Sequence, residues 1–336
     1  MAARRQAHCC QRRDCGDQAQ KVRQQAASAQ QDPMRKIKVI YIGGVGRSGS
    51  TILDRILGTI DGVSSCAEIY RIWEDGFVAN QLCSCWKGVD ECEFFAPLIR
   101  EVIGERNKYQ RVIELQESVD HSRHFFKLYT GLSSPTFQSN VAELKDLLEK
   151  LYFALAKASN CDILVDSSKL PSRAFLLSQI PGIEVHLVHI VRDVRALAYA
   201  WQKDKYNPAI GRNMTKHPVR RIVIAWWVFN VLLEFLSSML PYSRIRYEDF
   251  AVNPRVETQR LIETLRPVAG RRAAFLNEKT VELGPIHTIG GNPHRFFHGT
   301  TEIRFDTEWV TKLDAETRGL VTLLTYPLLS RYGYNT

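Results

Sequence analysis

The sequence has no run of about 18 uncharged apolar residues, which is the length that a helix needs to cross a bilayer. The nearest candidate is residues 222–240, which Asn230 and Glu234 interrupt and whose aromatic and branched residues suit a buried helix. The N-terminal stretch 1–33 also lacks the apolar segment of a secretory signal. These absences favour a soluble protein without stable membrane insertion, and we predict a cytoplasmic location.

Large apolar residues are almost missing from residues 1–33, which are rich in glutamine, arginine and alanine. Such a segment cannot bury enough surface to offset the entropy of ordering it, so we predict a disordered arm. Met34 directly precedes the first predicted strand, so the natural start could be Met1 or Met34. Residues 34–336 are long enough for one large domain, and we predict a single one.

The formal net charge of +9 favours anionic partners, such as a nucleotide, a nucleic acid or a membrane surface. The basic residues form no compact patch outside the arm, and no nucleic-acid reading motif appears. We therefore expect no nucleic-acid partner. The sequence says nothing about oligomeric state.

Three of the eight cysteines form a C-x-C-x6-C cluster at Cys83, Cys85 and Cys92. Disulfides are not the default in a cytoplasmic chain. A closed zinc site needs four ligands, and a histidine or a more distant cysteine could supply the fourth. The cluster is therefore either a metal site or a set of free thiols.

Short apolar runs alternate with helical patterns along the chain. Four runs are predicted strands: residues 36–44, 161–169, 182–193 and 243–250. A helix is expected after each, which indicates a parallel sheet with helices on both faces. Residues 70–160 carry helical patterns and are predicted to be a helical insertion that shapes an acceptor pocket. The fold class is α/β.

The stretch 42–58, IGGVGRSGSTILDRILG, is nearly a nucleotide-binding phosphate loop. It lies between a predicted strand and a helix N-terminus, where backbone N–H groups and the helix dipole favour an anion. The pattern GxxxxGK[ST] would require a lysine after Gly49, and Ser50 stands there instead. The lysine that reaches the outer phosphates of a nucleoside triphosphate is thus absent.

Three interpretations of this loop remain. A small-molecule kinase using Mg-ATP is supported by Asp166, which ends a predicted strand and could hold Mg²⁺, and is opposed by the missing lysine. A Gly-rich turn that only permits tight packing would not need so many anion donors. A loop for a 5′-phosphate that carries a sulfuryl group would lose nothing without the lysine.

The segment GRSGST resembles the 5′-phosphosulfate loop of the sulfotransferases that use 3′-phosphoadenosine 5′-phosphosulfate (PAPS). The segment HIVRDVRALAYAW is similar to the 3′-phosphate motif of that family, and VDSSKLPSR, RYEDFAVNP and GGNPHRF extend the resemblance from about residue 39 to the C-terminus. The NQLCSC stretch is shared with soluble bacterial members. The resemblance implies a P-loop-type fold, PAPS as cosubstrate, PAP as product and a reaction that requires no metal.

The resemblance also implies roles for residues of the loop. Arg47 stands where the family places a cation that stabilises charge on the departing bridging oxygen. The backbone around Ser48, Gly49, Ser50 and Thr51, with the two last hydroxyls, would bind the 5′-phosphate.

The 3′-phosphate would be bound by Arg192, because a guanidinium binds phosphate in a bidentate way. The family pairs this arginine with a serine eight residues later, where this chain has Ala200. The lost hydroxyl is worth about 0.5–1.5 kcal/mol, so cofactor binding should be weaker. A non-catalytic PAP-binding protein is a further alternative that this departure suggests. Asp193 is expected to be a helix N-cap.

Glu68 has the spacing from Arg47 that resembles the catalytic glutamate of the tyrosylprotein branch, so it would act as general base. Lys169 resembles a lysine that other branches direct at the sulfuryl group. Tyr247 matches a position near adenine, and Arg295 lies in a segment similar to the late Gly-rich nucleotide loop. The acceptor would carry a hydroxyl or amine; carbohydrates, lipids, peptide tyrosines and small molecules all remain open.

Overall fold

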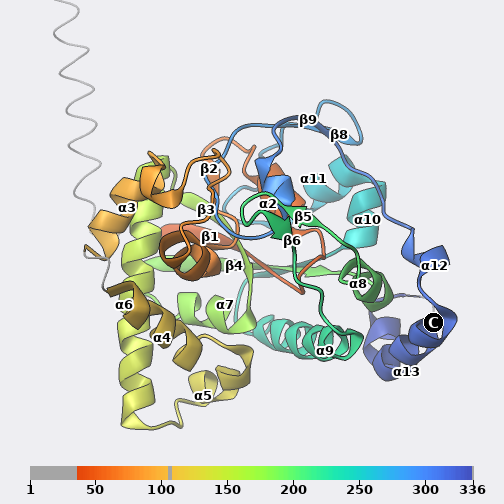
Figure 1. Cartoon of the computed structure of the whole chain (residues 1–336), viewed down its shortest axis with the longest axis horizontal. Coiled ribbons are helices and arrows are strands. Elements are labelled where there is room, and N and C mark those ends of the chain that lie inside the picture. Colours follow the sequence, from red (N-terminus) through yellow and green to blue (C-terminus); the bar gives the residue numbers. More distant parts are fainter. Residues whose placement is uncertain (1–35, 105–107, 335–336) are drawn as a thin grey trace, which may run out of the picture. The chain divides into compact units, whose positions relative to one another are not determined.

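The computed structural model describes residues 36–104 and 108–334, so the predicted arm 1–33 and Met34 lie outside the described residues. Its centre is a sheet of five parallel strands in the order β2-β3-β1-β4-β7, which confirms the predicted α/β class (Figure 1). The strands are β1 (Ile37–Gly43), β2 (Val63–Ser65), β3 (Ile163–Lys169), β4 (Ile183–Val191) and β7 (Tyr242–Arg246). Two short antiparallel hairpins accompany it: β5 (Tyr206–Asn207) with β6 (Arg212–Asn213), and β8 (Thr280–Leu283) with β9 (Gly299–Glu302).

Helices cover both faces of the sheet, as the alternation of strands and helices predicts. They are α2 (Ser50–Leu57), α3 (Phe95–Val102), α4 (Tyr109–Val119), α5 (Phe125–Thr130), α6 (Pro135–Ser159), α7 (Pro171–Ser178), α8 (Val194–Ala200), α9 (Val219–Leu236), α10 (Tyr247–Val252), α11 (Pro254–Thr264), α12 (Trp309–Lys312) and α13 (Ala315–Arg331). Short helical turns are η1 (Ile69–Arg71), η2 (Ile72–Val78), η3 (Val89–Glu91), η5 (Ser122–His124) and η6 (Pro293–Phe296). None of the helices in the described ranges is long and apolar enough to cross a membrane.

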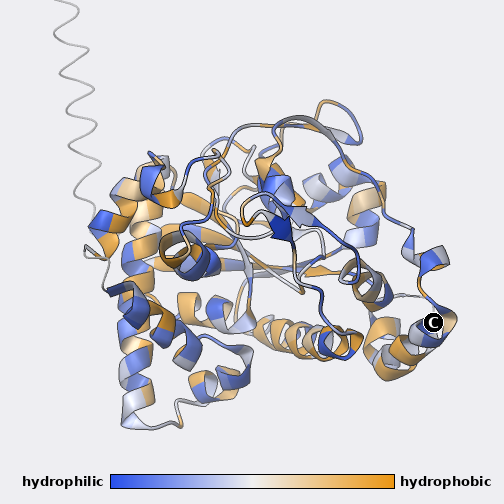
Figure 2. Ribbon diagram, viewed as in Figure 1, coloured by the Kyte–Doolittle hydropathy of each residue, from blue (hydrophilic) through white to orange (hydrophobic). Residues whose placement is uncertain are grey.

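Strand β1 shows how the sequence builds two cores. Its side chains alternate between the faces of the sheet, because successive residues of a strand point in opposite directions. Val39 and Tyr41 join a cluster with α3, α4, α6 and α7, whereas Ile40 and Ile42 join one with α2, α10 and α11. Figure 2 shows hydrophobic residues along the strands and much of α9, with hydrophilic residues on the outer parts of the flanking helices.

The strand predicted at residues 243–250 is wrong in its second half, because β7 ends at Arg246 and helix α10 begins at Tyr247. Acidic residues in the first turn of a helix interact favourably with its dipole, and Glu248 and Asp249 occupy that turn. Strand β2 was not predicted, since its three residues are too short to show a period, and it is stabilised by pairing with β3. Between η1 and β3, the described residues include the helices α3 to α6 of the region 70–160.

The carboxyl ends of three neighbouring strands meet at one edge of the sheet. Gly43 at the end of β1 is in register with Lys169 on one side and His189 on the other. Arg192 follows directly after β4. Ligands of open α/β sheets bind at this edge, so the fold places the predicted loop, lysine and arginine close together.

Candidate active site

The loop between β1 and α2 is fixed by a glycine that no other residue could replace without strain. Gly49 has φ +87°, and a Cβ atom there would lie 2.6 Å from the ring of Tyr247. Helix α2 begins at Ser50, and no side chain caps its first turn. The first amides of the helix are therefore not taken by a side-chain cap, as an anion site requires.

The side chains of the loop keep unsatisfied hydrogen-bonding groups. Ser48 is 1% exposed, and its hydroxyl has no hydrogen-bond partner. Ser50 is also buried, and Thr51 is half-buried. Buried polar groups without a partner are rare in native proteins, and this hydroxyl is available to hydrogen-bond to an anion.

Arg47 has a backbone φ of +75°, which is unusual for a residue other than glycine. Its guanidinium stacks over the ring of Trp201 at 5.1 Å, and one amino group is 3.3 Å from the sulfur of Met214. Its buried Nε atom has no partner. Burial lowers the pKa of Arg47, with the nearby Arg192 acting in the same direction and Glu68 opposing both.

Arg192 reaches the loop from the end of β4. Its Nη1 atom donates to the backbone carbonyl of Arg47 at 2.7 Å, and its guanidinium lies over the ring of Tyr247 at 4.1 Å. Its Nη2 atom is 3.8 Å from a carboxylate oxygen of Asp306, and its Nε atom is buried without a partner. Asp193, the next residue, caps α8 by accepting from the Arg195 amide, which confirms the predicted N-cap.

Glu68 and Lys169 form an ion pair beside the loop. The Lys169 Nζ atom is 2.6 Å from Glu68 Oε1 and also donates to the carbonyl of Ser167 at 2.9 Å. The pair is mostly buried, with 10% and 18% of the two side chains exposed. The contact arises because Ala67 accepts a hydrogen bond from the amide of Ser167, which ties the end of β2 to the end of β3.

A glycine pair closes the other side of Glu68. Gly291 has φ +82°, and a Cβ atom there would lie 2.6 Å from Glu68 Oε1. A Cβ atom at Gly290 would likewise lie 2.7 Å from the Cβ atom of Arg71. The segment 284–292 therefore runs directly against the glutamate, and Glu68, His287 and Ile289 line a small cavity together with apolar side chains such as Ile69 and Ile72.

Two of the predicted nucleotide contacts have structural roles in this arrangement. Tyr247 is buried at the junction of β7 and α10, where its ring contacts Gly49 and Arg192. Arg295 is 2% exposed, and it donates to the carbonyls of Thr288 and Leu82. Its amino groups are thus used inside the protein, and these contacts give no support to a phosphate-binding role.

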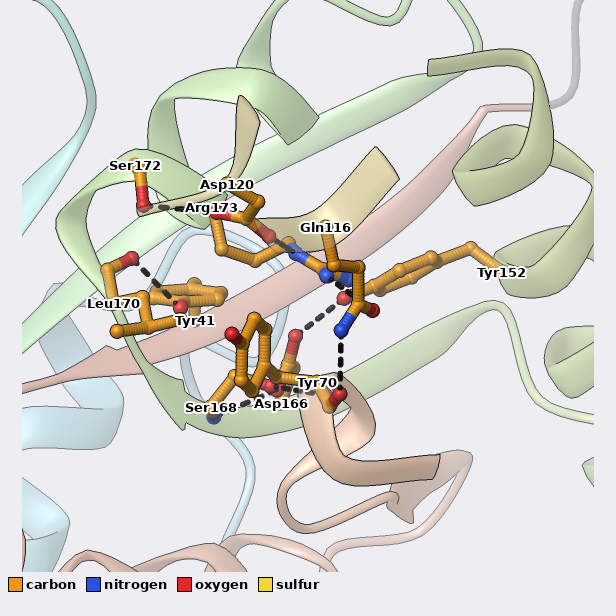
Figure 3. Close-up of polar contacts among 10 residues, drawn as sticks. All are labelled: Tyr41, Tyr70, Gln116, Asp120, Tyr152, Asp166, Ser168, Leu170, Ser172 and Arg173. Carbon is orange, nitrogen blue, oxygen red and sulfur yellow. Dashed lines mark hydrogen bonds and ion pairs between the residues drawn. The ribbon is translucent and has the colours of Figure 1, made fainter. Parts of the chain in front are cut away.

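Asp166, the carboxylate that a magnesium-dependent kinase would need, is enclosed in a buried network (Figure 3). One of its oxygens accepts from the amide of Ser168 at 2.8 Å and from its hydroxyl at 2.5 Å, and the other accepts from Tyr152. The side chain is fully buried, and burial raises its pKa. Both carboxylate oxygens of Asp166 therefore accept hydrogen bonds inside the protein, and these contacts give no support to a role as a metal ligand.

The hydrogen-bond network around Asp166 also includes a buried ion pair, Arg173 with Asp120. Arg173 pairs with Asp120 and donates to Gln116 at 3.0 Å, and Gln116 donates to the carbonyl of Tyr70 (Figure 3). Charged groups are buried at such cost that they are normally paired, as here. The network connects the helical region to η1, which follows Glu68 in the chain.

The sequence analysis did not identify three residues that lie near Arg47 and Arg192. Trp201 donates to the carbonyl of Gly46 at 3.1 Å and carries Arg47 on its ring. Burial lowers the pKa of Lys205 to about 8, with Arg47 contributing. Asp306 comes from a loop more than 100 residues away in sequence. Trp201 ends the segment HIVRDVRALAYAW, but the resemblance gave it no role. Lys205 and Asp306 lie in no recognisable motif, so only the fold could identify them. Ala200 is half-buried at the end of α8.

No known family profile matches the sequence, and no curated protein matches it. Among solved structures, the chain is similar to a sulfotransferase domain from the curacin biosynthetic pathway, with 16% identity, a TM-score of 0.44 and coverage of 90% of this chain and 99% of that domain. It is also similar to a sulfotransferase domain of the Synechococcus PCC 7002 olefin synthase, with 16% identity, a TM-score of 0.47 and coverage of 91% and 98%. A sulfotransferase from Mycobacterium tuberculosis is similar at 12% identity, with a TM-score of 0.37 and coverage of 74% and 72%. At these values the likeness assigns no activity to this chain.

Proposed function

We propose that this protein is a sulfotransferase that moves a sulfuryl group from PAPS to a hydroxyl or amine acceptor. One observation carries the proposal. Around a strand–loop–helix junction, buried donors of Arg47, Ser48 and Arg192 lack partners, and an ion pair of Glu68 with Lys169 stands beside them. Such a set suits a polyanion next to a group that can take up a proton.

The residues present fit the nucleotide that the resemblance implies. The loop amides and the Ser48, Ser50 and Thr51 hydroxyls would bind the 5′-phosphate, and Arg192 would bind the 3′-phosphate. Ala200 offers no hydroxyl there, so the arginine would carry more of that contact. When bound, PAPS supplies the sulfuryl group and leaves as PAP.

Two cations of the site, Arg47 and Lys169, would act on the reaction itself, whereas the loop would bind the nucleotide. Arg47 and Lys169 would stabilise the negative charge that develops on the departing oxygen, because fixed charges in a buried site need no reorganisation when the reaction occurs. Arg47 is prepared for this by its stacking on Trp201, which limits the positions of its guanidinium.

Glu68 would take the proton from the acceptor. In the structure its carboxylate is oriented by Lys169 and confined by Gly291. A base must lie within hydrogen-bond reach of the proton that it removes, so the acceptor hydroxyl or amine would lie next to the Glu68 carboxylate. The acceptor itself would be a small molecule, a glycan or a lipid, and we propose that the reaction takes place in the cytoplasm.

Calorimetric titration with PAP, and separately with Mg-ATP, tests the nucleotide. We expect micromolar PAP binding and weak Mg-ATP binding in the intact protein, and a loss of at least about tenfold in PAP affinity for Arg192→Ala. The matched control is Arg260→Ala on the exposed face of α11, which removes the same charge away from the site. Tight Mg-ATP binding without PAP binding would overturn the proposal in favour of the kinase.

Turnover tests the catalytic assignment. With labelled PAPS and a panel of hydroxyl and amine acceptors, Glu68→Gln and Arg47→Ala should keep the fold and lose about 100-fold or more of the rate, the range typical for a general base or an electrostatic group. Unimpaired turnover in either variant would contradict that residue's role. PAP binding in a chain that transfers sulfate to no acceptor would favour a non-catalytic PAP-binding protein.

A further inference from the structure

The structure brings a fourth ligand to the cysteine cluster. His287 lies about 200 residues from Cys83, Cys85 and Cys92 in sequence, yet one ligand atom from each of the four residues lies within 4.8 Å of the others. The Nδ1 atom of His287 is 3.2 Å from the Cys92 sulfur and 3.8 Å from the Cys83 sulfur. The sulfurs of Cys85 and Cys92 are 3.7 Å apart.

These separations are those of a tetrahedral zinc site. With Zn–S bonds of about 2.3 Å and Zn–N bonds of about 2.0 Å, tetrahedral angles place sulfurs about 3.8 Å apart and a nitrogen about 3.5 Å from a sulfur. The ligand set Cys3His is one that structural zinc uses, and it leaves no open coordination position. We propose that Cys83, Cys85, Cys92 and His287 bind one structural Zn²⁺ ion.

The backbone around the cysteines is built for a compact turn. The amide of Cys83 donates to the carbonyl of Lys87 at 2.8 Å, and the amide of Trp86 donates to the carbonyl of Cys83 at 2.8 Å. This turn brings Cys83 and Cys85 to the same side, although a single residue separates them. Cys92 then lies just before α3, with its carbonyl bonded to the amide of Ala96.

The histidine is held in place independently of any metal. Ser84, between two of the cysteines, donates from its amide to the carbonyl of Thr288 and from its hydroxyl to that of Ile286. The His287 ring stacks on Phe94 with 5.3 Å between ring centres and 12° between planes. Both neighbours of the histidine are thus bonded to the cysteine turn, and its Nδ1 atom faces the sulfurs.

A disulfide accounts for these contacts less well than zinc. It would use two of the sulfurs and leave the third cysteine and the histidine without a function, whereas zinc uses all four groups. All five cysteines of the described residues are free thiols in this structure. Soft thiolates together with imidazole favour zinc over the harder cations that carboxylates bind.

The metal would connect the region between β2 and β3 to the segment that confines Glu68. His287 lies three and four residues before Gly290 and Gly291, and Gly291 contacts the Glu68 carboxylate. Arg295 adds a second connection, because it bonds to Leu82 on one side and Thr288 on the other. We therefore expect zinc to hold the Gly290–Gly291 backbone against Glu68. Zinc binding itself does not depend on the proposed activity; only this positioning effect rests on it.

Metal analysis of the full chain tests the site. Cys9, Cys10 and Cys15 are first replaced by serine, so that cysteines of the N-terminal residues cannot contribute. We expect about one zinc per chain after purification without added metal, and intense visible absorption with a thiolate charge-transfer band after exchange with Co²⁺, both typical of a tetrahedral thiolate site. Substoichiometric metal together with weak octahedral-type Co²⁺ absorption would overturn the proposal.

Variants assign the ligands. Cys92→Ser and His287→Ala should lower zinc content and raise the rate of zinc loss to a chromogenic chelator by about tenfold or more, whereas His287→Cys should restore a four-ligand site. Cys161→Ser, which changes a free thiol outside the cluster, should match the parent protein. If Cys92→Ser does not fold, thiol titration of the parent with and without chelator decides: three thiols that become reactive only after chelation support zinc, and two that react only after reduction indicate a disulfide.

Discussion

At the scale of single residues, the site brings several cations together around the loop. Arg47, Arg192 and Lys205 approach one another around the loop, and the pKa of Lys205 is lowered to about 8, first by burial and then by Arg47. A protein gathers like charges at a cost in stability, and anion binding is a function that justifies it. Perturbed groups of this kind are therefore markers of the site.

Lys205 gives the site a pH dependence. A lysine with a pKa of about 8 is charged at pH 7 and mostly neutral at pH 9, so PAP affinity should fall by about threefold to tenfold between these values. Calorimetry at pH 7, 8 and 9 measures this slope. Lys205→Arg keeps its charge and should flatten it, and the exposed Arg260→Ala should not. Equal slopes in the wild type and Lys205→Arg would show that another group titrates.

At the scale of elements, the short connections do more for the site than the helices do. The turn after β2 carries Glu68, the end of β3 carries Lys169, and the segment after β8 carries Gly291. The first and third are irregular backbone and the second is a strand end, and each is tied by hydrogen bonds or close contacts to a neighbour that is remote in sequence. Loops held by a rigid sheet are where functional groups usually lie.

Gly291→Ala tests the contact between the segment after β8 and Glu68. Alanine at φ +82° costs about 1–2 kcal/mol of conformational strain, and its Cβ would displace the nearby carboxylate. Gly270→Ala is the matched control, because Gly270 has φ +80° and open space around its Cβ position. We expect a loss of stability in both variants, larger in Gly291→Ala because its Cβ also meets the Glu68 carboxylate, unchanged PAP affinity in both, and a fall of about tenfold or more in turnover for Gly291→Ala alone. Equal turnover in the two variants would remove the contact from the mechanism.

At the scale of the whole molecule, stability depends on polar groups buried beside the sheet. His189 on β4 is completely buried between Asn230, at 2.7 Å, and Tyr242, at 2.8 Å. Burial lowers its pKa to about 4. On α2, burial raises the pKa of Asp54 to about 7, although Ser65 donates to its carboxylate. The two groups act on stability in opposite directions as the pH changes.

His189 should make the protein less stable in mild acid. The unfolded histidine takes up a proton near pH 6.5 and the folded one only near pH 4, so the stability that it contributes is complete above pH 6.5 and is lost as the pH falls through that window. The loss amounts to at most about 3 kcal/mol. In denaturant unfolding at pH 7, 6 and 5, the free energy of unfolding of the wild type should fall relative to that of His189→Gln, because the opposite contribution of Asp54 is the same in both proteins. The exposed His298→Gln should behave like the wild type, and a slope unchanged in His189→Gln would assign the acid sensitivity elsewhere.

The local sequence determined the elements and their order. Apolar β-branched runs followed by helical patterns specified four of the five parallel strands, and the glycines and hydroxyls of residues 42–58 specified a loop between a strand and a helix, because these features depend only on neighbouring residues. The same local reasoning failed where a contact with another part of the chain determined the secondary structure. Strand β2 exists through its pairing with β3, and α10 begins at Tyr247 inside a segment that looks like a continuous strand.

Only the tertiary structure decided which distant side chains meet. It paired Glu68 with Lys169, placed Tyr152 against the buried carboxylate of Asp166, and used Arg295 to bind carbonyls of the interior. It also placed His287 beside three cysteines about 200 residues away. Hydrophobic period and turn chemistry carry no information about such contacts, since these depend on how the strands are ordered in the sheet and on where the loops between them return.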